Sequence, residues 1–392
     1  MSDAVIVAAA RTPIGTARKG MLLDVTTFEL ARYAAGEALK RSGISAGDVD
    51  DMLMGESLQG GGCVARYAAI ELGLTEVPGM AFNRHCASGM GAVQGAAGSI
   101  IAGMDTVVIA GGSESMSTTP QTTKRTPFTD DWGPWMSPSH PEQPDAPAFD
   151  MSITVGLNTA NALGLTRADC DEWAVRSHER AVRAIDEGRF EDEIVAVEVK
   201  RRDGSTTIFD TDEHPRRDST IEKMSSLKPL HPEIENFPIT AGNASGLNDG
   251  AAAMMVVSSD YAAAHGLTPL AKIVSWASTG TNPRDTGLGP ILSIPKALER
   301  AGMTVADVNL AEINEAFASV PVAACRKLGL SEDITNVSGS GCSLGHPVAA
   351  TGARMIITTM FELRRRGGGI GLASMCAGGG MGSATVFEVY PG

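Results

Sequence analysis

The apolar residues of the chain follow two patterns that alternate along its length. Short apolar runs are typical of strands buried on both faces, and apolar residues spaced three or four positions apart are typical of amphipathic helices. The runs predict strands at 4–9, 49–54, 106–110, 194–200, 206–209, 251–258, 271–278, 308–313 and 369–375. The periodic segments predict helices at 27–42, 65–72, 92–101, 154–163, 167–187, 290–300 and 349–364. This alternation predicts an α/β fold with a mostly parallel sheet covered by helices.

The last third of the chain repeats the order of the first third. Strand 271–278 corresponds to strand 4–9. Helix 349–364 follows a Gly-rich turn that opens at Asn336, as a helix follows the turn that opens at Asn83. We therefore predict an approximate duplication of a βαβ-rich unit. If the copies pack together, their two Gly-rich corners meet near a pseudo-twofold axis, where a reactive centre draws residues from both.

The middle of the chain departs from this pattern. From Ser117 to about Asp150 it is rich in Pro, Thr, Ser, Asp and Trp and shows no sustained period, which predicts a long loop excursion. Further along, Arg216 and Arg217 belong to a local basic cluster. A solvated surface turn and an anion-binding patch are both open interpretations of this pair.

Charge and cysteine content narrow the class of protein. The formal net charge is −14, which argues against a general nucleic-acid binder or a binder of anionic membranes. The six cysteines are scattered without a CxxC pair, so neither a structural zinc site nor another metal site is expected. We see no signal peptide and no apolar stretch long enough to span a bilayer, and we expect a reduced, cytoplasmic protein.

Cys86 lies in a polar turn that is followed by small residues and then by a helical pattern. We expect it at or near the first turn of the helix, where the positive end of the helix dipole would lower the thiol pKa. Small neighbours such as Gly89 and Gly91 would let a ligand approach the backbone. The alternative is a buried, inert cysteine.

Three residues of the C-terminal copy offer what a cysteine nucleophile needs. His346 lies in a loop before a helix, and imidazole is a suitable base at neutral pH. Asn314 carries a carboxamide that can hold a water or donate to an oxyanion, and Cys376 follows a strand beside glycine-rich backbone. Separately, each has an ordinary explanation: a helix cap, a loop histidine and a packed cysteine. Their joint presence with Cys86 at strand-to-helix corners favours a catalytic centre.

Seven stretches carry a resemblance over the whole chain to the thiolases, which are acyl-CoA:acetyl-CoA acyltransferases. They are Arg11–Gly15, Asn83–Val93, Gly111–Met116, Thr240–Gly250, Asn314–Phe317, Gly345–Pro347 and Cys376–Gly380. The resemblance implies the thiolase fold, in which two duplicated βαβ-rich halves pack as layered α/β sheets around an inserted loop domain. The implied halves are 1–117 plus 249–269 and 270–392, and the implied loop domain is 118–248.

The resemblance also implies catalytic roles. Cys86 is similar to the nucleophile that becomes acylated, His346 to the base that activates it, and Cys376 to the acid/base at the α-carbon. Asn314 is similar to the residue that holds a water which, with His346, binds the enolate oxygen. The peptide N–H groups of Cys86 and Gly378 are similar to a second oxyanion hole. The implied reaction is thiolytic cleavage of 3-oxoacyl-CoA, or the reverse Claisen condensation, through an acyl-cysteine intermediate.

Coenzyme A and acetyl-CoA enter this reaction as substrates, and the resemblance implies no permanently bound cofactor. The implied coenzyme A contacts are Arg216, Ala244, Ser245, Leu247, Ala316 and Phe317. Three places differ from the common thiolase pattern: Asp150, where many thiolases carry a histidine, the segment 337–344, and the segment 127–147 with its two tryptophans. The acyl chain length and the physiological direction therefore stay open. The resemblance further implies a homodimer built on the first half, or a homotetramer.

Two other classes of protein on the same fold stay open. A condensing enzyme that uses an acyl carrier protein would replace Cys376 by a histidine or an asparagine. A non-catalytic acyl-CoA or lipid carrier would be expected to lose Cys86 or His346. The chain keeps all three residues, which favours the thiolase interpretation. A papain-like hydrolase is a third idea, but nothing in the sequence marks a peptide-binding cleft.

Overall fold

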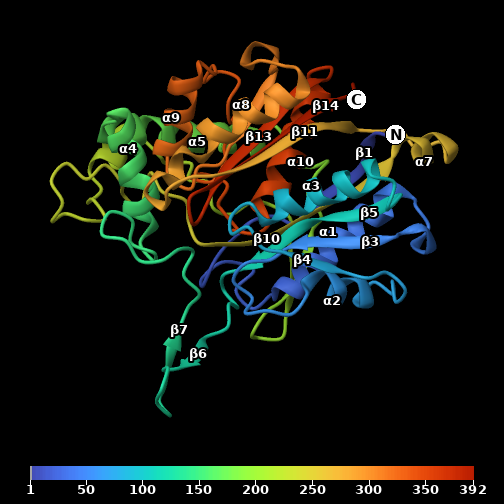
Figure 1. The fold of residues 1–392 in the computed structure, drawn as a ribbon, viewed down its shortest axis with the longest axis horizontal. Helices are drawn as coiled ribbons and strands as arrows, with labels where there is room; N and C mark the ends of the chain where they lie inside the picture. The colour runs from blue at the N-terminus through green and yellow to red at the C-terminus, as the bar shows by residue number, and fades with distance from the viewer. Residues whose placement is uncertain (1) are drawn as a thin grey trace.

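A computed structural model describes residues 2–392, and one sheet of ten strands runs through it (Figure 1). The strands are β1 (Ala4–Arg11), β2 (Gly15–Thr16), β3 (Asp51–Gly55), β4 (Met80–Phe82), β5 (Val107–Ser115), β10 (Asn248–Ser258), β11 (Ala271–Gly280), β12 (Leu310–Ile313), β13 (Gly369–Ala377) and β14 (Met381–Val389). Their order is β12-β13-β14-β11-β1-β10-β5-β3-β4, with β2 paired to β10. From the central β1–β11 pair, the order and the strand directions repeat outward on both sides, so the predicted duplication is present.

The expectation of a mostly parallel sheet was wrong. Only the pairs β3–β5, β3–β4 and β12–β13 of this sheet are parallel. The remaining pairs are antiparallel. The physical reason lies in two returning strands: β14 turns back from β13 through the Gly378–Gly380 loop, and β10 enters between β1 and β5 after the long insertion.

Helices cover and separate the two groups of strands. They are α1 (Thr27–Ser42), α2 (Val64–Glu71), α3 (Ser88–Ile101), α7 (Ser259–Ala264), α8 (Gly289–Ala301), α9 (Ser319–Leu328) and α10 (Thr351–Arg365), with short turns η1 (Ala46–Asp48), η3 (Pro283–Leu288) and η4 (Val305–Asp307). α3 and α10 share one core with strands of both halves, whereas α1 and α2 pack on the first half and α8 and α9 on the second. Figure 1 shows α3 and α10 between the two groups of strands. The layered arrangement predicted from the sequence is therefore confirmed.

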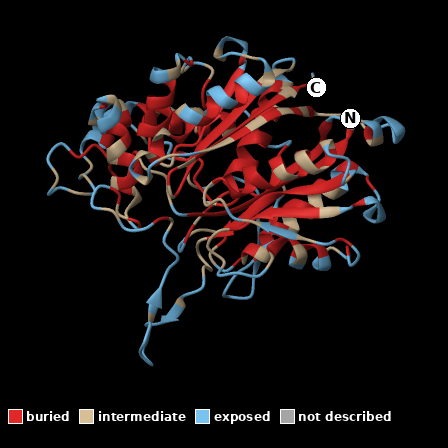
Figure 2. Cartoon of the chain, in the orientation of Figure 1, coloured by how far each residue is buried: buried red, intermediate tan, exposed pale blue. Residues whose placement is uncertain are grey.

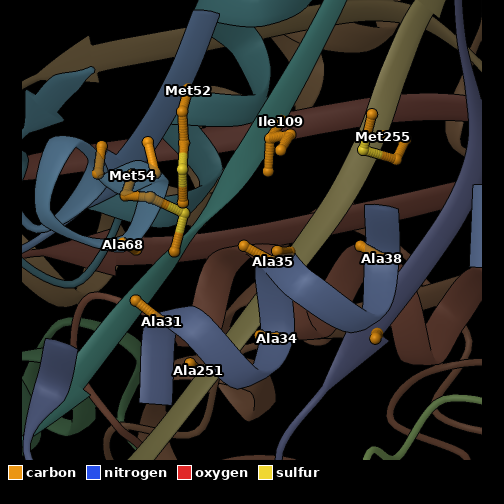
Figure 3. Close-up of a cluster of buried hydrophobic side chains, with 14 of the residues drawn as sticks. Ala31, Ala34, Ala35, Ala38, Met52, Met54, Ala68, Ile109, Ala251 and Met255 are labelled. Carbon is orange, nitrogen blue, oxygen red and sulfur yellow. The ribbon is translucent and has the colours of Figure 1, made fainter. Parts of the chain in front are cut away.

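Helix α1 illustrates why this sequence packs so closely against the sheet. Its alanines at 31, 34, 35 and 38 recur at helical spacing and are fully buried against Met52, Met54, Ile109 and Met255 (Figure 3). Small side chains let the helix approach the strands, and each buried methionine contributes roughly 1.5–3 kcal/mol. Thr26 and Glu29 form a capping box at the start, and Gly43 ends the helix in the left-handed region at φ 67°.

The segment between β5 and β10 contains a projecting hairpin and a small helical region. Its elements are β6 (Thr122–Arg125), β7 (Trp132–Trp135), the π-helix η2 (Ser152–Leu157), α4 (Asn158–Leu163), α5 (Arg167–Asp186), β8 (Val197–Lys200), β9 (Thr206–Phe209) and α6 (Ile221–Ser225). The β6–β7 hairpin extends away from the body and is largely exposed (Figures 1 and 2), although the sequence predicted an irregular loop there. The helix predicted at 154–163 begins with π turns instead.

A buried ion network ties this segment to the first strand. Arg11 at the end of β1 donates to Glu193 at 2.6 Å and to both carboxylate oxygens of Asp212 at 2.8 and 2.9 Å. All three side chains are buried, so removing one partner would leave an uncompensated charge.

Among residues 2–392, no helix is long and apolar enough to cross a bilayer.

Candidate active site

Cys86 lies in a tight turn between β4 and α3. His85 has φ 47°, in the left-handed region, and α3 begins at Ser88, so the cysteine precedes the helix rather than starting it. Ser88 fixes the turn, because its hydroxyl donates to the carbonyl of His85 at 2.6 Å and accepts from the N–H of Arg84 at 2.9 Å. The peptide N–H groups of Cys86 and Gly378 both lie near this sulfur and lower the pKa of the thiol. Two peptide donors from different halves of the molecule therefore converge on Sγ.

The expected fall in the pKa of Cys86 was wrong. Burial raises the pKa of this thiol to about 11, and the nearby Glu114 carboxylate adds to the rise. The two peptide N–H groups lower the pKa, but by less than the loss of water raises it. The resting nucleophile is therefore a neutral thiol, which needs a base when it attacks.

His346 is held as a neutral imidazole in the loop before α10. The hydroxyl of Thr351 donates to the carbonyl of Pro347 at 2.8 Å, so at 2.7 Å it accepts a hydrogen bond from Nδ1–H of His346. This leaves the lone pair on Nε2. Burial, with the charge of Arg354, lowers the pKa of His346 to about 3. The peptide N–H of His346 donates to Asn248 Oδ1 at 2.9 Å, which fixes the loop.

Asn314 brings its carboxamide to the same imidazole. It directly follows β12, and its Nδ2 lies 3.4 Å from Nε2 of His346. Its Oδ1 is buried and has no hydrogen-bond partner among the described residues. A methyl group built on Gly341 would lie 2.8 Å from this oxygen, so glycine keeps that position clear. Oδ1 is therefore free to accept a hydrogen bond from a ligand or a water.

Cys376 is the second sulfur at this corner. It is the penultimate residue of β13, it is buried, and its pKa is raised by burial and by the neighbouring Cys86. The loop that carries His346 packs closely against the first half of the chain. Methyl groups built on Gly89 and Gly112 would lie 2.5 and 2.0 Å from the carbonyl oxygen of Ala349, so only glycine fits at these two positions.

Within residues 2–392, no cluster of His, Cys, Asp and Glu is suited to hold a metal ion.

The residues expected to contact coenzyme A fall into two groups. Ala244 pairs with Phe317 in an isolated bridge, and the N–H of Ser245 donates to the carbonyl of Ala316 at 3.0 Å. Leu247, 46% exposed, follows two residues after Ser245 in the chain. Ala244, Ser245, Ala316 and Phe317 therefore lie together in the segment that follows Asn314 and in the loop beside it.

Arg216 lies apart from these residues. With Arg183 and Arg217 it lines a cavity of about 320 Å³ against α5. Arg217 is paired with Asp186 at 2.6 Å, whereas Arg216 makes no side-chain ion pair within the described chain. The carboxylates of Glu179, Asp186 and Glu187 line the same cavity, so an anion there would meet negative charge as well as the guanidinium groups of Arg183 and Arg216.

Comparison with known proteins decides the family. Family models described as the thiolase N-terminal domain and the thiolase C-terminal domain match residues 4–260 and 267–389. The chain belongs to the thiolase family. It is 41% identical to the acetyl-CoA acetyltransferase of Syntrophomonas wolfei over 98% of this chain and 99% of that protein, and 38% identical to the 3-ketoacyl-CoA thiolase of Bacillus subtilis over 99% and 100%. The crystal structure of the Bacillus anthracis acetyl-CoA acetyltransferase superimposes with a TM-score of 0.91, at 39% identity over 99% of both chains.

Several supporting residues of this thiolase were missed by sequence reasoning. Glu315 is fully buried and accepts from Trp173 Nε1, Ser177 Oγ, Asn336 Nδ2 and the N–H of Cys342. It therefore fixes the backbone beside Asn314. The sequence could have revealed Glu315, because it lies inside the stretch Asn314–Phe317 that carries the family resemblance. Thr351 and Asn248, which orient His346, carry no pattern of their own that would reveal them.

His231 lies beside Asp150, although the two residues are far apart in the sequence. Nε2 of His231 lies 2.8 Å from Asp150, and Nδ1 lies 2.7 Å from Glu233. Its ring packs edge-on against Phe237 with a centroid distance of 4.9 Å. The hydrogen bond to Glu233, together with Asp150, raises the pKa of His231 and favours its charged form. A histidine from a distant loop therefore contacts Asp150.

Proposed function

We propose that this thiolase is an acyl-CoA:acetyl-CoA C-acyltransferase that uses Cys86 as its acyl carrier. The observation that carries the proposal is the corner where Cys86 Sγ lies near the peptide N–H groups of Cys86 and Gly378 and beside Cys376. Two sulfurs match a reaction with two tasks, because one thiolate must hold the acyl group while another group moves a proton at carbon. No permanently bound cofactor is needed.

In the first step, Cys86 attacks the ketone carbon of a 3-oxoacyl-CoA while its thiol proton moves to Nε2 of His346. The ketone oxygen becomes an oxyanion that the N–H groups of Cys86 and Gly378 stabilise. Because the pKa of His346 is lowered to about 3, the imidazole starts neutral with a free lone pair on Nε2, but it is a weak base that takes the proton only as the attack proceeds. The thiolate therefore forms only as the new carbon–sulfur bond forms.

In the second step, the C2–C3 bond breaks and leaves the acyl group on Cys86. The bonding electrons pass to C2 and give the enolate of acetyl-CoA, whose oxygen is held by His346 and by a water on Asn314. The Cys376 thiol then gives its proton to C2, which releases acetyl-CoA. Its raised pKa keeps this thiol protonated until the carbanion develops. Free coenzyme A gives its thiol proton to the Cys376 thiolate and takes the acyl group from Cys86, and His346 returns its proton to the Cys86 thiolate that leaves.

Coenzyme A is proposed to lie along the segment 118–248. The residues Ala244, Ser245, Leu247, Ala316 and Phe317 suit the apolar and amide parts of pantetheine. Arg216 offers a phosphate a planar guanidinium with free N–H groups. The low number of cysteines and their free state are consistent with a cytoplasmic enzyme.

A panel of 3-oxoacyl-CoA thioesters tests the activity directly. With coenzyme A present, we expect acetoacetyl-CoA or a longer homologue to be cleaved to acetyl-CoA and a shortened acyl-CoA. Chromatography of the CoA products gives the rate for each chain length. The absence of acetyl-CoA from every member of the panel would contradict the proposed function.

We further propose that the thiolase forms a dimer through its first half. The edge strand β4 and the helix α2 beside it present Met80, Tyr67 and Ile70, and the Met80 side chain is 52% exposed. An unpaired edge with apolar side chains is a surface that another chain readily covers. The β6–β7 hairpin, where Trp132 is 67% exposed, is available to join dimers into a tetramer.

Light scattering is expected to give a dimer or a tetramer at micromolar concentration. If the hairpin joins dimers, the double variant Trp132→Ser, Trp135→Ser lowers the mass from a tetramer to a dimer. A monomer in the unchanged protein would contradict the dimer, and an unchanged tetramer in the variant would exclude the hairpin from assembly.

A further inference from the structure

Polar side chains surround the backbone that faces the nucleophile. A methyl group built on Gly378 would lie 3.1 Å from Cβ of Ser139, 3.5 Å from its Oγ and 3.5 Å from Cγ of His85. His85 directly precedes Cys86 in the chain. His85 and Ser139 therefore lie beside Gly378, whose N–H binds the carbonyl oxygen in the proposed reaction.

The His85 ring is held in place but has no hydrogen-bond partner within the described residues. Its backbone is fixed at φ 47°, and its N–H donates to Asn83 Oδ1 at 3.0 Å. The ring is partly buried, and this loss of water, together with the neighbouring His140, lowers the pKa of His85. A neutral imidazole in this position offers one donor and one acceptor to a ligand.

Ser139 is prepared to accept rather than to donate. Nε2 of His140 lies 2.9 Å from the carbonyl of Ala146, which can only accept, so this nitrogen carries the proton. Nδ1 of His140 therefore accepts the hydroxyl proton of Ser139 at 2.8 Å. The remaining lone pairs of Ser139 Oγ are open to a donor. A carboxylate has no proton to donate and would find no cation here, whereas a hydroxyl group can donate to Ser139 and accept from His85.

We propose that this thiolase selects acyl groups that carry a hydroxyl group close to the reacting carbonyl, and that His85 and Ser139 are the residues that select it. The proposal rests on the proposed acyl transfer to Cys86. An apolar acyl chain would leave these two polar groups facing hydrocarbon, which costs binding free energy. A hydroxylated chain satisfies both, and a site built for a hydroxyl group disfavours the analogue that lacks it.

Acylation of Cys86 by a matched pair of thioesters tests the proposal. The probes are butanoyl-CoA and both enantiomers of 3-hydroxybutanoyl-CoA, with succinyl-CoA as the charged comparison and acetyl-CoA as the reference. Mass spectrometry of the quenched enzyme gives the rate of acyl-enzyme formation. We expect one 3-hydroxybutanoyl enantiomer to react about tenfold faster than butanoyl-CoA, the effect of two ordinary hydrogen bonds.

The variants His85→Leu and Ser139→Ala are each expected to reduce this ratio by about threefold, since each removes one of the two hydrogen bonds. Using the ratio within each variant removes any general damage from the strained turn, and Ser139→Ala decides the question if His85→Leu does not fold. A ratio near one in the unchanged enzyme, a ratio that neither variant alters, or faster reaction with succinyl-CoA would overturn the proposal. If acetyl-CoA itself failed to acylate Cys86, the proposed acyl transfer would be contradicted, and the selectivity that depends on it would be contradicted as well.

Discussion

The variant Cys376→Ser is expected to retain acetylation of Cys86 by acetyl-CoA and to lose carbon–carbon bond cleavage. The loss should be about two to four orders of magnitude in the rate of acetoacetyl-CoA thiolysis, the usual contribution of a general acid or base. A serine hydroxyl is a much weaker acid than a thiol and cannot protonate the enolate carbon as readily. Acetylation should continue, because coenzyme A is a good leaving group as its thiolate and can depart without a proton from residue 376, while Cys86, His346 and the two peptide N–H groups are unchanged.

The matched control is Cys170→Ser, which changes another buried cysteine, in α5, that has no role in the proposed reaction. Its thiolysis rate should stay within about twofold of the unchanged enzyme, because Cys170 touches no reacting atom in the proposed mechanism. Equal loss of acetylation and cleavage in Cys376→Ser would show that the two sulfurs do not divide the reaction.

The variant His346→Gln is expected to slow the acetylation step itself, by about two to four orders of magnitude. Glutamine keeps a polar side chain at this position but cannot take the thiol proton. In the unchanged enzyme, the pKa of His346 is lowered to about 3, so the imidazole is already neutral throughout the usual working range. The acetylation rate should therefore show no inflection near the ordinary histidine pKa as the pH falls from 8 to about 5.

The control for this variant is His265→Gln, because His265 is an exposed residue that stacks on Tyr261. Stopped-flow measurement of coenzyme A release from acetyl-CoA gives the acetylation rate for both proteins. A His346→Gln enzyme that is acetylated at the rate of the His265→Gln enzyme would exclude His346 as the base.

Sequence patterns predicted the repeated order of strands and helices but not the direction of every strand. The positions of β1 and β11, and of α3 and α10, follow from apolar periodicity that is local to each element. The place of β10 does not, because its partners β1 and β5 are separated from it by long stretches of chain. The hairpin β6–β7 was missed because its strands are short and exposed, so they lack the buried alternation that identifies a strand.

For the candidate site, too, local patterns identified residues but not their tertiary surroundings. Cys86, His346, Asn314 and Cys376 were proposed from short motifs, and the structure brings Cys86 next to Cys376 and Asn314 next to His346. The direction of the Cys86 pKa shift was predicted wrongly, because the expected helix-end effect is outweighed by burial that only the tertiary structure reveals. Thr351 and Asn248 orient His346 through single hydrogen bonds, which leave no periodic trace in the sequence.

The central claim is that Cys86 carries the acyl group. Brief incubation with acetyl-CoA, acid quenching and peptide mass spectrometry should place one acetyl group on the peptide that contains Cys86. The Cys86→Ser variant should show no such modification on the same timescale, while Cys170→Ser should be acetylated like the unchanged enzyme. An acetyl group on Cys376 or Cys342 instead of Cys86 would contradict the account.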